Sequence, residues 1–137
     1  MKKALLLSLL LTVLLLVGCS AQPVEDVDPG EYTSISVETL DEMMETRRES
    51  FVLVNTHIPY EGDLPGTDFS VPYDAIGQNL DLFPSDKDAE IVLYCMNDPM
   101  SLMAADQLFA AGYRNVKVLT GGMNAWQSAG FTLEFEP

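Results

Sequence analysis

The stretch Ile91–Gly112, IVLYCMNDPMSLMAADQLFAAG, decides the fold of this chain. A wholly apolar run, Ile91–Tyr94, is followed by Cys95, a short polar loop and a segment rich in Ala, Leu and Met that ends at Gly112. An apolar run without alternation is typical of a strand buried on both faces of a parallel sheet. A glycine after an apolar segment is a common helix stop. The stretch therefore predicts a strand–loop–helix unit, with Cys95 one residue beyond the carboxyl end of the strand.

The same alternation of strands and helices extends outward in both directions. It predicts helices from a cap at Ser36 to Arg48, over Tyr73–Phe83, over Met100–Ala111 and over Met123–Ala129, and strands at Phe51–Val54, Phe69–Pro72, Ile91–Tyr94 and Val116–Leu119. Such alternation indicates an α/β domain with a mainly parallel central sheet and helices on both faces. Ligands of such domains bind at the carboxyl ends of the strands, which is where Cys95 is expected.

The first 18 residues have the order of an export signal, with Met1-Lys2-Lys3 followed by an apolar run to Val17. The sequence Leu16-Val17-Gly18-Cys19 resembles the lipobox of bacterial lipoproteins. The resemblance implies cleavage before Cys19 and acyl chains such as palmitate on that residue, which would anchor the protein outside the cytoplasm to a bacterial membrane. An ordinary secretory signal with an incidental cysteine is the alternative. Residues 19–31 then form the acylated cysteine and a polar tether, and residues 32–137 the domain.

The charge of the mature chain excludes one class of partner. The signal carries two of the seven basic residues and none of the 21 acidic ones, which leaves 5 − 21 = −16. Nucleic acid is therefore not expected as a partner, since phosphate binding needs clustered Lys and Arg. If Cys19 is acylated, Cys95 is the only free thiol and no intramolecular disulfide can form. One histidine without a second free cysteine argues against a metal site, and we expect no cofactor.

Two interpretations of Cys95 follow from its position. A loop between a strand end and a helix start directs backbone N–H groups inward, and together with the helix dipole they favour a thiolate or persulfide. Alternatively, Cys95 is a small apolar residue that closes the end of a buried strand.

The chain resembles the rhodanese-like family over nearly the whole predicted domain. In VLTGGMNAWQSAG, Val118–Gly130, the glycines and Trp126 match the family's terminal Gly-Gly…Trp…Gly motif. An earlier family motif is matched by Gly62, Pro65, Gly66 and Pro72. The resemblance implies a sulfurtransferase in which Cys95 takes a sulfur atom as a persulfide and passes it to an acceptor. It also implies that the backbone N–H groups of one loop cradle that persulfide; the loop comprises Met96, Asn97, Asp98, Pro99, Met100 and Ser101.

Several positions depart from the family pattern. Met100 stands where the loop commonly has Arg, Asn55-Thr56-His57 where the family has Asp-x-Arg, and Asp63 where it has His. These changes remove positive charge or add negative charge near the expected site, and Asp98 would oppose a thiolate if it lay close. Thiosulfate, a dianion, should therefore bind poorly. The Cys-x5-Arg clamp of cysteine phosphatases is also absent, which excludes that activity.

His57, the only histidine, follows the first central strand and could pair with Cys95 or make a structural hydrogen bond instead. Two functions remain open. The first is a sulfurtransferase or persulfide carrier that uses Cys95 with a small sulfur donor or a protein persulfide partner. The second is a catalytically silent rhodanese-like module that binds a partner protein at the cell surface.

Overall fold

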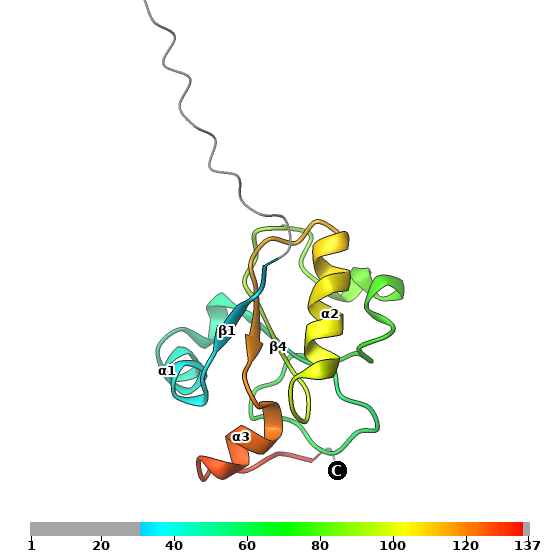
Figure 1. The fold of residues 1–137 in the computed structure, drawn as a ribbon. Helices are drawn as coiled ribbons and strands as arrows, with labels where there is room; N and C mark the ends of the chain where they lie inside the picture. Colours follow the sequence, from blue (N-terminus) through cyan, green and yellow to red (C-terminus); the bar gives the residue numbers. More distant parts are fainter. Residues whose placement is uncertain (1–30, 136–137) are drawn as a thin grey trace, which may run out of the picture.

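The computed structural model describes residues 31–135, and the predicted signal peptide, Cys19 and tether residues 20–30 lie outside this range. Five parallel strands form one sheet in the order β1-β5-β4-β2-β3, so β4 is central. Figure 1 labels β1 and the central β4. The strands are β1 (Thr33–Ile35), β2 (Val52–Asn55), β3 (Phe69–Ser70), β4 (Ile91–Tyr94) and β5 (Val116–Leu119). The α-helices are α1 (Val37–Arg47), α2 (Pro99–Ala110) and α3 (Gly122–Ser128), and the 3-10 helices are η1 (Arg48–Ser50), η2 (Ile76–Gln78) and η3 (Leu80–Leu82).

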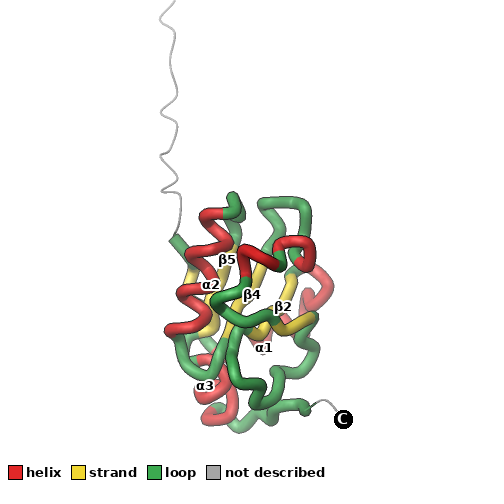
Figure 2. The backbone as a smooth tube through the Cα atoms, turned by 90° about the vertical axis from the view of Figure 1, so that its right-hand side faces the viewer, coloured by secondary structure: helices red, strands yellow, loops and turns green. Residues whose placement is uncertain are grey.

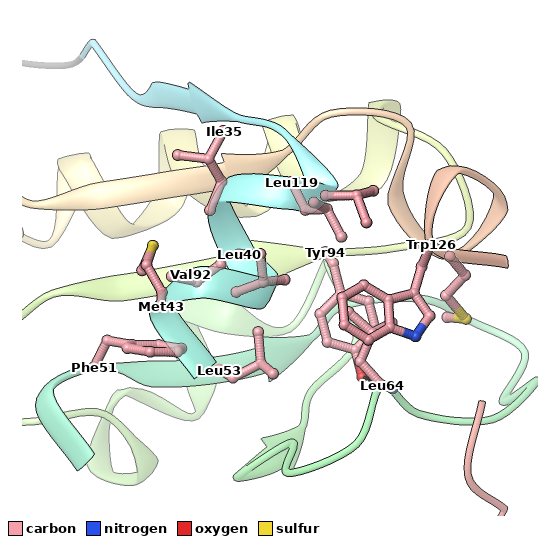
Figure 3. Packing of buried hydrophobic residues seen from close by; sticks show 12 residues of the cluster. Ile35, Leu40, Met43, Phe51, Leu53, Leu64, Val92, Tyr94, Leu119 and Trp126 are labelled. Atoms are coloured by element: carbon pink, nitrogen blue, oxygen red, sulfur yellow. Dashed lines mark hydrogen bonds between the residues drawn. The ribbon is translucent and has the colours of Figure 1, made fainter. Parts of the chain in front are cut away.

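Helices cover both faces of the sheet, as the sequence predicted. In Figure 2, α2 lies in front of the strands and α1 behind them. The α1 and α3 side encloses one apolar cluster, in which Trp126, Tyr94 and Leu40 lie close together (Figure 3). The α2 side encloses a second cluster, to which Leu93 of β4 contributes. Alternate residues of β4 thus serve opposite cores, which explains why its sequence is apolar at every position.

Local signals placed most element boundaries within one residue of those observed, although β3 ends at Ser70 and not at the predicted Pro72. The bounds of β4 and β5 are those predicted, and the Ser36 hydroxyl accepts the Thr39 N–H at 3.2 Å as the N-cap of α1. The sequence did not predict strand β1, because its three residues are too few to show a hydrophobic pattern. Its strand conformation depends on the pairing with β5.

The helix predicted over Tyr73–Phe83 is wrong, because this segment forms the two short turns η2 and η3. Gly77 weakens an α-helix there, and the Asn79 side chain donates to the Ala75 carbonyl at 2.8 Å in competition with the backbone. Within residues 31–135, no helix is both long and apolar enough to cross a membrane.

Candidate active site

Cys95 lies directly after β4, at the carboxyl end of the central strand, and is 2% exposed. Its Sγ is 3.6 Å from the Ser101 Oγ, and that hydroxyl donates to the Asp98 carbonyl at 2.9 Å. The Ser101 hydroxyl thus lies between the Cys95 sulfur and the carbonyl at the start of α2. The structure brings together three of the predicted site residues: Cys95, Asp98 and Ser101.

The N-terminus of α3 holds the loop that follows Cys95. The N–H groups of Met123 and Asn124 donate to the carbonyls of Cys95 and Met96 at 2.8 and 3.1 Å. Both loop peptides are trans, and in a trans peptide the C=O and N–H bonds point in opposite directions. Because these two carbonyls face α3, the N–H groups of Met96 and Asn97 point away from it.

Five donors of the loop have no hydrogen bond within residues 31–135. They are the backbone N–H groups of Met96, Asn97, Asp98, Met100 and Ser101. Pro99, the first residue of α2, has no N–H and contributes none, so the predicted six-residue cradle has at most five donors. Unpaired N–H groups beside a helix N-terminus favour an anionic group.

Asp98 faces the turn before α3. Its Oδ1 accepts the N–H of Gly121 at 2.7 Å and makes no cap to its own helix. A second contact between the loop and α3 is made by Asn124, whose Nδ2 donates to the Asn97 Oδ1. The carboxylate that could oppose a thiolate is therefore bound to a backbone donor of another segment.

Gly122 allows the loop and α3 to approach closely. A Cβ atom at this position would lie 2.1 Å from the Cys95 carbonyl oxygen and 2.6 Å from that of Asn97, and its φ is +51°. Only glycine fits such an approach. The second glycine of the Gly-Gly pair therefore allows the cysteine loop to pack directly against α3.

His57 has a partner other than Cys95. Its Nε2 lies 2.6 Å from the Glu61 Oε2, its side chain is 8% exposed, and its Nδ1 has no hydrogen-bond partner among the described residues. No hydrogen bond in this part of the chain joins His57 to Cys95. The pairing with Glu61 agrees with the structural alternative, and a role beside Cys95 stays a prediction.

Two departures from the family pattern contact each other. The Asn55 Nδ2 donates to the Asp63 Oδ1 at 2.8 Å, and the Tyr94 hydroxyl donates to the same oxygen at 3.1 Å. Burial raises the pKa of the Tyr94 phenol well above its usual value, so the phenol stays neutral and able to donate. Sequence reasoning did not find this network. The only indication in the sequence was that Asn55 and Asp63 both differ from the family pattern.

Positive charge is absent from the cysteine end of the sheet in residues 31–135. The five basic residues of this range lie at the amino ends of the strands, where acids or an aromatic ring hold them. Arg47 and Lys117 pair with Glu90, Arg48 with Asp68 and Arg114 with Asp88, and the Lys87 Nζ lies 3.7 Å from the centre of the Tyr113 ring. No group of three or more His, Cys, Asp or Glu side chains that could hold a metal occurs in the described range.

The parallel sheet, with a buried cysteine after its central strand and a loop held by a Gly-Gly turn, defines a single-cysteine rhodanese-type α/β domain. The family model described as "Rhodanese-like domain" matches residues 37–129, and the chain belongs to this family. Comparison with functionally curated proteins gave no match.

Solved structures with the same fold are distant in sequence. The rhodanese-like domain of a protein from Anabaena sp. has a TM-score of 0.66 at 20% identity, with 77% of this chain and 81% of that one covered. A thiosulfate sulfurtransferase from Pseudomonas aeruginosa gives 0.65 at 21% identity, with 77% of this chain but only 21% of that one covered. A protein of unknown function from Rhodopseudomonas palustris, described as a possible tyrosine phosphatase, gives 0.64 at 22%, with 75% and 85% covered. At these identities the comparisons establish the fold.

Proposed function

We propose that this protein is a sulfurtransferase or persulfide carrier that uses Cys95 and is anchored outside the cytoplasm to a bacterial membrane by an acylated Cys19. The observation that carries the catalytic part is the set of five unpaired backbone N–H groups in the loop after Cys95. N–H groups left unpaired between a strand end and a helix N-terminus favour a bound anionic group. A persulfide on Cys95 is such a group.

The reaction is covalent catalysis by a thiolate. The Cys95 thiol first loses its proton, and Sγ attacks the outer sulfur of a donor R–S–S⁻ or R–S–SH. A new S–S bond forms at Sγ, the donor's S–S bond breaks, and R–S⁻ leaves with the bonding electron pair. An acceptor thiolate then attacks the outer sulfur of the Cys95 persulfide, which restores the Cys95 thiolate. No external oxidant or reductant is needed.

Free thiosulfate should be a weak donor. The described residues offer no Lys or Arg at the cysteine end, and Met100 cannot bind a sulfonate group. The N–H groups of the loop suit the single negative charge of a persulfide. A neutral hydropersulfide or a protein persulfide therefore fits better as the donor.

The second candidate is a catalytically silent module that binds a partner protein. It is favoured by the 2% exposure of Cys95 and by the hydrogen bond that holds its thiol to Ser101. In this case the sulfur would remain inaccessible to any donor.

Mass spectrometry of the intact protein separates the two candidates. The chain from Ser20 to Pro137 is incubated with thiosulfate, with polysulfide and with glutathione persulfide, and Cys95→Ser serves as the control. We expect polysulfide and glutathione persulfide to add the mass of sulfur to the parent chain and nothing to the serine variant. An unmodified parent chain after all three donors would leave the binding module. Palmitate labelling of the full chain in a bacterial host, against Cys19→Ala, tests the anchor separately.

A further inference from the structure

The described chain enters the sheet at the end opposite to Cys95. Strand β1 pairs in parallel with β5, and its first residue, Thr33, lies beside Lys117 near the amino end of β5. Because all five strands are parallel, Cys95 and α3 lie at the other end. Figure 1 shows the start of β1 at the top of the domain and α3 at the bottom.

The two ends also differ in charge. Arg47, Arg114 and the other basic residues of the described range cluster at the amino end, beside Asp68, Asp88 and Glu90. The opposite end carries acids without a single Lys or Arg from this range. Five acids belong to it by their contacts: Glu38 in the first turn of α1, Glu61 beside His57, Asp63 beside Asn55, Asp98, and Glu134, which bridges to Asp63.

From these two asymmetries we propose that the protein stands on its membrane with the amino end of the sheet toward the lipid and the Cys95 end toward the water. The proposal rests on the anchored location in the proposed function. It identifies the partner class as well. Sulfur is exchanged with a donor or acceptor in the aqueous phase, such as a soluble persulfide-carrying protein or a small hydropersulfide, and not with a component buried in the bilayer.

The size of the domain and its charge distribution both favour this orientation. A domain of this size is about 30 Å across, and the chain between Cys19 and β1 is short. Turning the Cys95 end toward the lipid would require the tether to reach around the domain. It would also bring the acidic end within one Debye length, about 8 Å at physiological salt, of an anionic bilayer, which repels it.

Energy transfer to the vesicle surface tests the orientation. In a Cys95→Ser background, a single reporter dye is placed at Glu49→Cys, in η1 at the amino end, or at Gln127→Cys, in α3; both positions are exposed. The full acylated chain is reconstituted into phosphatidylglycerol vesicles that carry an acceptor on the headgroup. Transfer from position 49 should exceed transfer from position 127 by more than about twofold, since the ends lie about 30 Å apart. High salt or uncharged lipid should reduce the ratio.

Equal transfer from both positions, or a larger value at position 127, would overturn the orientation. Flotation of the vesicles reports the anchor independently. If the full chain does not float, the anchor has failed, and the same two labelled variants are held from Ser20 onward on nickel-chelating lipid by a His tag in place of Cys19. The transfer ratio in that form still decides the orientation.

Discussion

At the residue scale, Met100 determines which anions the loop can hold. It lies in the first turn of α2, within the loop that carries the five unpaired N–H groups, and is partly buried. We expect Met100→Arg to increase the rate of sulfur transfer from thiosulfate to Cys95. A hydrogen bond to a charged group contributes about 1.5–3 kcal/mol, so the increase should be about tenfold or more. Intact-mass measurements over time give the rate.

Met103→Arg is the matched control for this substitution. Met103 is one turn further along α2 and is 52% exposed, so an arginine there adds the same charge without reaching the loop. It should change the rate by much less than Met100→Arg. If the two variants were equally fast, the gain would come from overall charge, and the missing contact at position 100 would not be the cause of the weak thiosulfate reaction.

Single residues differ in how far sequence could place them. The position of Cys95 followed from the apolar run before it, because four apolar residues that end at a polar loop strongly favour a buried strand. The contact of Asn55 with Asp63 could not be predicted, because it joins a strand end to a loop eight residues later. The Glu61 partner of His57 depends on loop geometry in the same way.

At the element scale, the turn between β5 and α3 positions the cysteine loop. We expect Gly122→Ala to lower the free energy of unfolding by about 3 kcal/mol, the sum of a backbone clash and a positive φ. The methyl group would lie 2.1 Å from the Cys95 carbonyl oxygen and must push the loop away from α3. Denaturant unfolding measures the loss, and the yield of the Cys95 persulfide should fall with it.

Gly130→Ala is the control for the turn. Gly130 also has a positive φ, +94°, but a Cβ atom there would meet nothing within 4 Å. Its cost should be about 1 kcal/mol of backbone strain, with the persulfide yield unchanged. Equal losses of stability in the two variants would show that φ alone matters and that the loop and α3 do not lock together.

Glu90 links three elements at the amino end of the sheet. It precedes β4 and pairs with Arg47 of α1 and Lys117 of β5. The hydrogen bond from Arg47 is the main cause that lowers the pKa of the Glu90 carboxyl, so the unfolded chain binds its proton more readily than the folded one. Its contribution to stability is present above the ordinary glutamate pKa and is lost as the pH falls through the lower folded value.

Glu90→Gln should therefore reduce stability near neutral pH and flatten the decline of stability in acid. The loss should be at most about 1 kcal/mol, because the pair is partly solvated. Urea unfolding from pH 7 down to pH 3 measures both effects. If the free energy of unfolding fell with the same slope in acid in parent and variant, other carboxyl groups would be the cause of the fall.

Elements were predictable where local signals agreed. Ser36 predicted the start of α1, and the apolar runs predicted β4 and β5; the structure confirms all three. The segment from η2 to η3 carried apolar residues near helical spacing, yet Gly77 and the Asn79 side chain oppose a continuous helix. The spacing of apolar residues alone therefore predicted a helix where these two residues prevent one.

At the scale of the whole molecule, the uneven charge should govern how the donor's charge affects the rate. Residues 19–137 carry 5 − 21 = −16 formal charges, and the described basic residues all lie away from Cys95. A dianion such as thiosulfate must approach an end that carries only acids. Its reaction with Cys95 should therefore speed up as salt screens the repulsion.

A neutral donor separates this long-range effect from local chemistry. The rate of sulfur transfer to Cys95 is measured from about 10 mM salt, where the screening length is about 30 Å, to 1 M, where it is about 3 Å. With thiosulfate the rate should rise several-fold. With an uncharged organic trisulfide, which Sγ attacks to give a mixed polysulfide on Cys95 while a thiolate R–S⁻ leaves, the rate of Cys95 modification should stay nearly constant. A thiosulfate rate that falls with salt would reveal an attractive cation near Cys95 and contradict the charge distribution. Equal salt dependence for both donors would point to a change in the loop itself, because screening acts only on the charged donor.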